Sequence, residues 1–274
     1  MTRTANFGRW TWVTAAAAMA LAATTAPSGA AAPSGVSAQA PAYTEAKVAN
    51  GGTIQGKITL KGAAPKLVAR EITKNPEVCG HGTRPSQEVL TGDAGALMNA
   101  VVGIDAIAQG KAWSPEAMNP VLDQVGCEYV PHVQVAGLGA KLSVKNSDAV
   151  LHNVHAYQGG EETLFNVAMP LKDQMIPKKL KEPGVVHIKC DAGHTWMNGW
   201  IVVRENPYGA VTAKDGAFSL ADVPAGTYKL TAWHEFFGSI TKDVTVPAGG
   251  AVTVDFIFDA SMRAAGMGAA GPKG

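Results

Sequence analysis

Short apolar runs, broken at close intervals by glycine and proline, constrain the fold of this chain more than any other feature. Residues 51–66 (GGTIQGKITLKGAAPK) alternate apolar and polar side chains and then stop at glycine and proline. Such alternation is typical of a strand with one buried face that ends in a turn. Residues 210–259 repeat strand and turn through KDG, PAG, FFG and PAGG. The sequence therefore predicts an all-β chain.

Further strand patterns lie between these two stretches. They are ALMNAVVGIDAI at residues 96–107, PHVQVAGLGAKLSVKNSD at 131–148, VVHIKC at 185–190 and WIVVRE at 200–205. Helix signals are weak, apart from a possible turn over residues 171–180. Short strands with frequent turns are typical of β-sandwiches, and the C-terminal stretch alone fits a small one.

The N-terminal residues have the composition of an export signal. Arg3 and Arg9 precede an apolar block at residues 10–23, and small residues suited to a signal peptidase follow it. An uncleaved anchor is the alternative, although the block is short and rich in alanine. We expect cleavage near Ala30 and a soluble mature protein, without a membrane span, in the periplasm or otherwise outside the cytoplasm.

The charged residues are nearly balanced. Lys and Arg number 23 against 22 Asp and Glu, for a formal net charge of +1. Because the basic residues form no cluster, the chain lacks the electrostatic footprint of a protein that binds nucleic acid. The partner is expected to be a protein or a small molecule.

The cysteines give an odd count: Cys79, Cys127 and Cys190. In an oxidising compartment two of them can pair, which leaves one thiol to be explained. The simplest pairing joins Cys79 to Cys127 and leaves Cys190 as a thiolate that a bound metal protects from oxidation. The alternative is that one cysteine is simply buried.

Soft metal donors gather at two strand ends. The loop CDAGHTWM carries Cys190, His194 and Met197, and the stretch VKNSDAVLHNVHAY delivers His152 where a strand runs out. A thiolate, two imidazoles and a thioether suit copper, with the thioether as a long axial ligand. Zinc could occupy the same pocket, but methionine contributes little to zinc. The alternative is that these are ordinary loop and core residues, with Cys190 an inert thiol.

The remaining histidines give weaker signals. His155 and His187 lie at strand positions and are expected to be structural. His81, His132 and His234 lie near turns and could be exposed. None of them is assigned to a metal.

Around the two donor loops the chain resembles the cupredoxins, the small blue copper proteins, and HNVH and HTWMNGWIVV are most similar to amicyanin. The resemblance covers roughly residues 121–205. It implies one type 1 copper ion whose ligands are His152, Cys190, His194 and Met197.

The same resemblance implies a supporting residue and shows a departure. Asn153 matches the residue that ties the two ligand loops together. Three residues separate Cys190 from His194, whereas amicyanin-like loops have two, so we expect a slightly distorted pocket. A dinuclear copper site of the respiratory-oxidase kind would need a cysteine where Val186 stands. A mononuclear site is therefore expected.

The larger chain resembles exported bacterial proteins of the methylamine-utilisation-like and carboxypeptidase-regulatory-like kinds, which join a cupredoxin to a transthyretin-like module. LDQVGCEYVPHV, GTIQGKITLKGAAP and VTAKDGAFSLADVPAGTYKLTAWHE carry this resemblance. It implies a Greek-key cupredoxin sandwich nested as an insertion in a small transthyretin-like host sandwich. A disulfide from Cys79 to Cys127 would then join the host to the inserted domain. Two domains in tandem fit nearly as well. The expected parts are a signal peptide (1–30), a flexible lead-in (31–50), an N-terminal segment of the small sandwich (51–112), the cupredoxin domain (119–205), the carboxypeptidase-regulatory-like sandwich (206–259) and a disordered tail (260–274).

Electron transfer follows from this ligand set. A copper site with one weak axial bond is a compromise between the geometries that the two copper oxidation states prefer. Little therefore needs to move when an electron arrives or leaves. The chain is therefore expected to carry single electrons between periplasmic redox proteins, and not to be an enzyme. The edge of His194 is the expected electron port. An apolar docking patch near it would draw on Val150, Leu151, Met169, Pro170, Trp196 and Trp200.

Other classes of function remain as alternatives. The same ligands could serve copper buffering or delivery. The small sandwich could be an envelope binding module with a structural copper site. A small oxidase or a nitrite-type reductase would need further ligands, which His81, His132 and His155 do not clearly supply.

Overall fold

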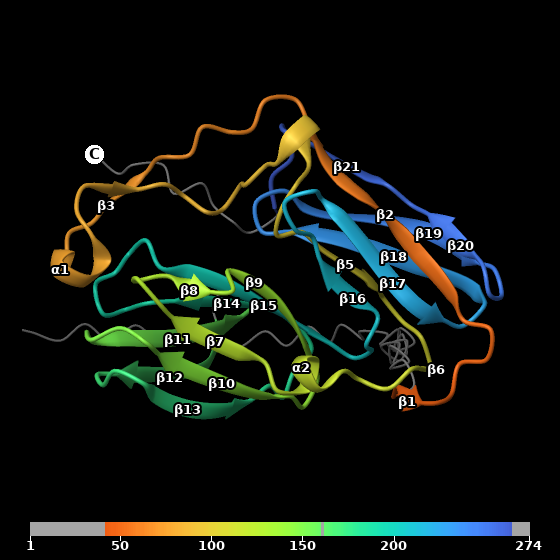
Figure 1. Cartoon of the computed structure of the whole chain (residues 1–274), viewed down its shortest axis with the longest axis horizontal. Helices are drawn as coiled ribbons and strands as arrows, with labels where there is room; N and C mark the ends of the chain where they lie inside the picture. The colour runs from red at the N-terminus through yellow and green to blue at the C-terminus, as the bar shows by residue number, and fades with distance from the viewer. Residues whose placement is uncertain (1–41, 160–161, 265–274) are drawn as a thin grey trace, which may run out of the picture. The chain divides into compact units, whose positions relative to one another are not determined.

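The structure is a computed structural model that describes residues 42–159 and 162–264 (Figure 1). Among these residues the regular structure is almost entirely β, which confirms the predicted fold class, and the strands form two sandwiches. We call the strands within residues 121–204 the insert sandwich. The strands at residues 52–61 and 101–104, together with those within residues 209–259, are the host sandwich. The expected signal peptide lies outside the described residues.

The insert sandwich pairs its strands in two sheets. One sheet has the order β13 (Gln174–Lys179), β10 (Lys141–Asn146), β7 (Val121–Gln124) and β8 (Tyr129–Val130). The other has the order β12 (Glu162–Met169), β11 (His152–Gln158), β14 (Gly184–Lys189), β15 (Asn198–Arg204) and β9 (Val133–Gly137). Leu142 and Val144 alternate with more exposed neighbours on β10, and they meet Val154 and Ile188 of the facing sheet in one apolar core.

One local expectation differs from the structure. Residues 171–180, considered as a possible helical turn, contain strand β13 instead. The strand forms because its backbone pairs antiparallel with β10 from Gln174↔Asn146 to Lys179↔Lys141, and its side chains alternate in exposure at the sheet edge. Tertiary pairing therefore overrides a weak local helix signal.

The host sandwich is built from both flanks of the insert. One sheet has the order β16 (Gly209–Val211), β5 (Val101–Ile104), β18 (Gly226–His234) and β19 (Gly238–Val246). The other has the order β17 (Ala217–Val223), β2 (Gly52–Lys61) and β20 (Ala251–Thr253), and β21 (Phe256–Asp259) also pairs with β2. Because β2 and β5 precede the insert while their partners follow it, the pairing is the nested arrangement.

Short elements lie outside the sandwiches. They are β1 (Thr44–Glu45), β3 (Arg70–Glu71), β4 (Thr83–Arg84), β6 (Gln109–Gly110), α1 (Pro76–Cys79), α2 (Pro115–Met118) and η1 (Asp93–Gly95). Strand β1 pairs with β6, so this part of the lead-in is ordered. At the other end, the amide of Ala264 donates to the carbonyl of Phe236 at 3.0 Å. None of the described helices is long and apolar enough to cross a bilayer.

Between β2 and β5 the chain leaves the host and passes over to the insert sandwich, where β3 and α1 lie (Figure 1). Residues 70–84, which we call the cover segment, are tied there by a disulfide between Cys79 and Cys127. Arg84 adds an ion pair with Glu128, and its guanidinium donates to the carbonyl of Cys79 at 2.7 Å. This segment is therefore held covalently against the insert.

Apolar packing and a buried polar network join the two sandwiches. Glu235 of the host is buried, accepts a hydrogen bond from Nε1 of Trp200 at 2.7 Å and contacts the imidazole of His132. Trp200 also packs edge to face with Trp233. His132 and His234 lie near turns in the sequence and were expected to be exposed, but both are buried. His132 contacts Glu235 where the sandwiches meet, whereas His234 packs against Phe237 and Phe258 of the host.

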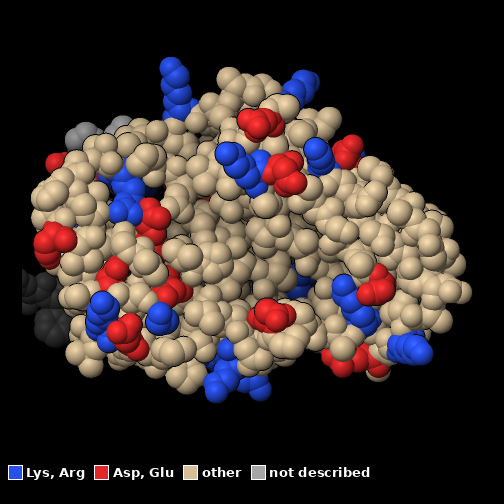
Figure 2. All heavy atoms as spheres, in the orientation of Figure 1, with Lys and Arg blue, Asp and Glu red and all other residues tan. Residues whose placement is uncertain are grey.

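Basic and acidic side chains are interspersed over the face of the molecule that Figure 2 shows. This mixture agrees with the formal net charge of +1. The face in view therefore presents no extended basic surface of the kind that binds nucleic acid.

The buried His234 makes the stability of the host dependent on pH. Burial lowers the pKa of His234 from 6.5 to about 4, because the ring lies against Phe237 and other apolar groups. The unfolded chain therefore binds this proton at a higher pH than the folded chain. We expect the free energy of unfolding to fall as the pH drops from about 6.5 towards 4, by about 3 kcal/mol in total from this group.

Denaturant unfolding between pH 7.5 and 4.5 checks this expectation. His234→Asn should reduce the pH dependence, because asparagine does not titrate in this range. Its side-chain oxygen can still accept from the amide of Phe236, which donates to Nδ1 of His234 at 3.2 Å. His81→Asn, at an exposed position, should leave the dependence unchanged. Equal pH dependence in the His234→Asn variant and the wild type would contradict the assignment.

Candidate metal centre

Adjacent strands of one sheet bring the sequence-predicted donors together. His152 begins β11, and Cys190 follows the end of β14, which pairs antiparallel with β11. The loop between β14 and β15 then carries His194 and Met197, and the amide of Met197 donates to the carbonyl of His194 at 2.9 Å. The pairing of β11 with β14 therefore positions His152 and Cys190, and the tight loop after β14 positions His194 and Met197.

Three of the four predicted donors converge on one point. The donor atoms of His152, Cys190 and His194 all lie within 4.8 Å of one another. The two Nδ1 atoms are 3.3 Å apart, and Sγ of Cys190 is 3.6 Å from Nδ1 of His194. Both imidazoles are 0% exposed, and Cys190 is 6% exposed. Met197 is buried in the adjoining core.

The outer nitrogen of each imidazole is already used. Nε2 of His152 lies 2.8 Å from a carboxylate oxygen of Asp148, and Nε2 of His194 lies 3.1 Å from the amide oxygen of Asn75. Both partners are acceptors, so each Nε2 carries a proton. Both Nδ1 atoms therefore face inward, towards each other and towards Cys190. A cation bound between them would take the lone pairs of both nitrogens.

The electrostatics of the site also suit a bound cation. Burial raises the pKa of the Cys190 thiol, although hydrogen bonds from the backbone amides of Ala192, Asn153 and His194 favour the thiolate. Burial lowers the pKa of His194 to about 4, with further contributions from His152 and Lys74. A neutral His194 is ready to donate its lone pair, and a metal ion would supply the positive charge that a buried thiolate lacks.

Asp148 is a supporting residue that the sequence analysis did not identify. Its carboxylate accepts from the backbone amides of Gly126 and Cys127, at 2.8 Å each, in addition to the imidazole of His152. The side chain is buried, so these bonds fix it firmly. A carboxylate four residues before a histidine was the only local signal, and it is too common to stand out. The carboxylate orients the His152 ring.

Asn153 lies between the two donor loops, where the resemblance placed it. Its Oδ1 accepts from the amide of Asp191 at 3.0 Å, and its Nδ2 donates to the carbonyl of Val167 at 3.2 Å. Trp196 ties the loop that carries His194 to the turn between β7 and β8, by donating Nε1–H to the carbonyl of Cys127 at 3.0 Å. The bond between Asn153 and Asp191 limits how far the two donor segments can move apart.

The expected exposure of His194 is wrong for this structure. Its ring is fully buried, because the cover segment lies over it and Asn75 occupies its outer edge. Three members of the expected apolar patch are also core residues, namely Met169, Trp196 and Trp200. Leu151 is 44% exposed and remains at the surface.

Other groupings of metal-binding side chains overlap this site. In the part of the chain that the structure describes, they combine Cys79, Cys127 and His194, or Cys127, Asp148 and His152. The two sulfurs of the disulfide are not free to act as thiolates. The grouping of His152, Cys190 and His194 is therefore the one with its donors available.

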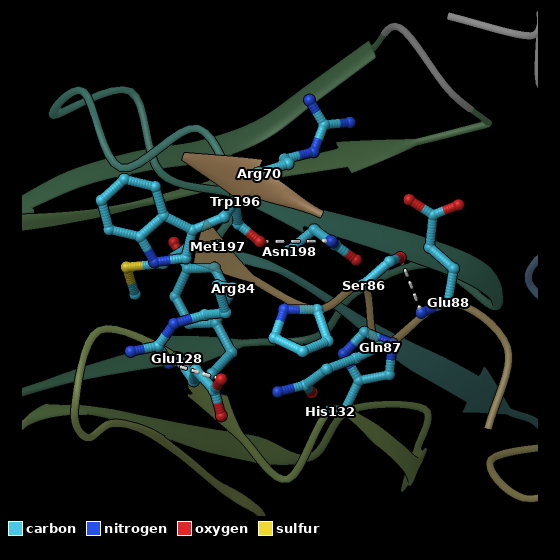
Figure 3. Close-up of a pocket in the computed structure, with 12 residues that line it drawn as sticks. Arg70, Arg84, Ser86, Gln87, Glu88, Glu128, His132, Trp196, Met197 and Asn198 are labelled. Carbon is cyan, nitrogen blue, oxygen red and sulfur yellow. Dashed lines mark hydrogen bonds and ion pairs between the residues drawn. The ribbon is translucent and has the colours of Figure 1, made fainter. Parts of the chain in front are cut away.

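We call residues 190–197, between β14 and β15, the ligand loop. A pocket opens between this loop and the cover segment (Figure 3). Both charged and aromatic side chains border it. Its lining is Arg70, Arg84, Pro85, Ser86, Gln87, Glu88, Glu128, Tyr129, His132, Trp196, Met197 and Asn198. The predicted axial donor therefore lies beside this pocket.

Comparisons with known proteins agree with the resemblances drawn from the motifs. A family model described as the carboxypeptidase regulatory-like domain matches residues 200–259, and the neighbours among solved structures include cupredoxins. A search of curated proteins finds no match.

Three solved structures illustrate the similarity. An amicyanin variant in its oxidised state is 29% identical, with a TM-score of 0.29, over 32% of this chain and 83% of that chain. A purple cupredoxin from Nitrosopumilus maritimus is 22% identical, with a TM-score of 0.27, over 31% of this chain and 98% of that chain. A copper-containing nitrite reductase from Thermus scotoductus SA-01 is 22% identical, with a TM-score of 0.28, over 38% of this chain and 25% of that chain.

Proposed function

We propose that the protein holds one copper ion and carries single electrons between partner proteins outside the cytoplasm. The ligands are His152, Cys190, His194 and Met197. The main support is the pair of inward-facing Nδ1 atoms of His152 and His194, 3.3 Å apart, beside the Cys190 thiol. Thiolate, imidazole and thioether are soft or borderline donors, which favours copper over hard cations. Bound copper would supply a reversible one-electron change.

The surrounding residues suit an electron carrier better than an enzyme or a delivery protein. Asp148 and Asn75 hold the two imidazole rings at their outer nitrogens, and Asn153 ties the two loops. Little of this framework needs to move when the charge of the ion changes. The burial of all four donors excludes water and favours retention of the ion over exchange.

An exported location is part of the proposal. A disulfide between Cys79 and Cys127 persists in oxidising compartments such as the periplasm. The N-terminal residues 1–30 have the composition of an export signal. The partner would then be another redox protein. We predict that it docks near His194, on the outer surface of the cover segment that lies over this ring.

The visible absorption spectrum and copper content of the purified protein test the proposal. We expect one copper ion per chain and an intense blue or green band from the bond between Cys190 and copper. Cys190→Ser should remove the band, because an alcohol cannot replace the thiolate. His152→Gln should also lose it, whereas His81→Gln, at an exposed histidine, should keep it. A colourless wild type that binds zinc or no metal would overturn the proposal.

A further inference from the structure

The outer edge of His194 is capped by an asparagine from a distant part of the chain. Oδ1 of Asn75 lies 3.1 Å from Nε2 of His194, across 119 residues of sequence. The His194 ring is fully buried, and Asn75 is partly buried above it. The contact therefore closes the side of the site on which a ligand histidine could otherwise meet solvent.

The side chain of Asn75 is oriented for this contact. Nδ2 of Asn75 donates to a carboxylate oxygen of Glu77 at 3.2 Å, so the amide oxygen is the atom that faces His194. Asn75 precedes helix α1, where an asparagine commonly caps the first amides, yet its side chain makes no capping bond. The backbone adopts a left-handed conformation, with φ of 50°, which asparagine tolerates. The side chain serves His194 and not its own helix.

The cover segment holds Asn75 in place from both sides. Four residues further on, Cys79 is joined by the disulfide to Cys127 of the insert. On the preceding side, Lys74 packs over the ligand loop so closely that a Cβ added at Gly193 would lie 3.0 Å from its Cδ. Figure 3 shows Arg84 of the same segment reaching Glu128 beside Trp196. Asn75 is therefore anchored.

We propose that Asn75 is a positioning residue for the metal ligand His194. By accepting the Nε2 proton, it keeps the Nδ1 lone pair directed at the site, and with the cover segment it shields the ring from water. This inference rests on the proposed copper site. A redox partner that approaches from this side meets the cover segment and Asn75, not the edge of the ligand itself.

Two substitutions at Asn75 separate this role from a structural one. Asn75→Gly removes the acceptor without straining the left-handed backbone. Asn75→Asp keeps an oxygen in the same place and should restore the wild-type behaviour of His194. Asn50→Gly is the matched control, because Asn50 is an exposed asparagine with a similar φ of 51° elsewhere in the chain.

The first readout is the tautomer of His194 in the metal-free protein, measured by long-range ¹H–¹⁵N NMR of the imidazole nitrogens. We expect a single tautomer protonated at Nε2 in the wild type, in Asn75→Asp and in Asn50→Gly, and a mixture in Asn75→Gly. The second readout is the rate at which copper passes to a chromophoric chelator. This rate should rise about tenfold or more in Asn75→Gly alone.

The outcomes distinguish the two proposals. A wild type that takes up no copper would defeat the proposed function, and the NMR measurement would still decide whether Asn75 sets the tautomer of His194. A copper-loaded wild type together with an Asn75→Gly variant of unchanged tautomer and unchanged copper loss would overturn the role of Asn75. The same changes in Asn50→Gly would also overturn it.

Discussion

Replacing Cys79 and Cys127 together by alanine is expected to lower the free energy of unfolding by about 4 kcal/mol, because the disulfide closes a loop with a sequence separation of 48. The crosslink restricts the unfolded chain, and a longer loop gives a larger restriction. Both cysteines are buried. Because alanine is apolar, the substitutions leave no unpaired polar group at these positions. Urea or guanidinium unfolding of the metal-free protein measures the change.

The disulfide should also control the mobility of the cover segment. In the double alanine variant we expect faster amide hydrogen exchange over residues 70–84 than over the strands of the insert. Arg84→Gln is the comparison, because it removes the ion pair with Glu128 but leaves the covalent bond. That partly exposed pair should contribute less than about 1 kcal/mol. A loss below about 1 kcal/mol in the double variant would contradict the expectation.

Asp148→Asn is expected to lower the affinity of the site for Cu(I) by about 10-fold to 100-fold. The carboxylate accepts three hydrogen bonds, from Gly126, Cys127 and His152. An asparagine has only one oxygen, so its NH₂ group must face at least one of these donors. Since Oδ2 serves both Cys127 and His152 while Oδ1 serves Gly126, the NH₂ group would oppose the amide of Gly126 and displace the side chain. The His152 ring then keeps only a neutral amide oxygen, which is a weaker acceptor than a carboxylate. Competition with a chromophoric Cu(I) chelator measures the affinity.

Asp123→Asn is the matched control for this substitution. Asp123 lies on β7 of the same sandwich, and its Oδ2 binds Nζ of Lys145 at 3.1 Å and the hydroxyl of Ser147 at 2.9 Å. It has no bond to His152, so Cu(I) affinity should stay at the wild-type value. Equal affinities of the wild type and Asp148→Asn would show that the backbone alone orients His152.

The strands were predictable wherever the buried face follows the local pattern. VVHIKC and WIVVRE correspond to β14 and β15, because nearly every apolar side chain in them is buried in the sheet. The stretch over residues 171–180 was not predictable, since β13 depends on a neighbour about thirty residues earlier in the chain. Residues 44–45 likewise form a strand only because residues 109–110 lie beside them.

The candidate site divides in the same way. Cys190, His194 and Met197 stand within eight residues, so their chemistry and order could be recognised from the loop alone. Asp148 and Asn75 gave no such signal, because an aspartate in a turn or an asparagine before a proline is common without a ligand. Sheet pairing and the disulfide bring them to the imidazoles.

The sequence by itself determined that the chain is all-β and that it carries a soft donor set, because alternation and short spacing are local properties. Only the tertiary structure decided that His194 is buried, that Asn75 caps it and that β2 and β5 complete sheets whose other strands come after the insert. The physical reason is that these contacts join residues far apart in the chain. They form only when the packing of the sheets and the disulfide close long loops. A short sequence pattern does not indicate which surface a distant segment will cover.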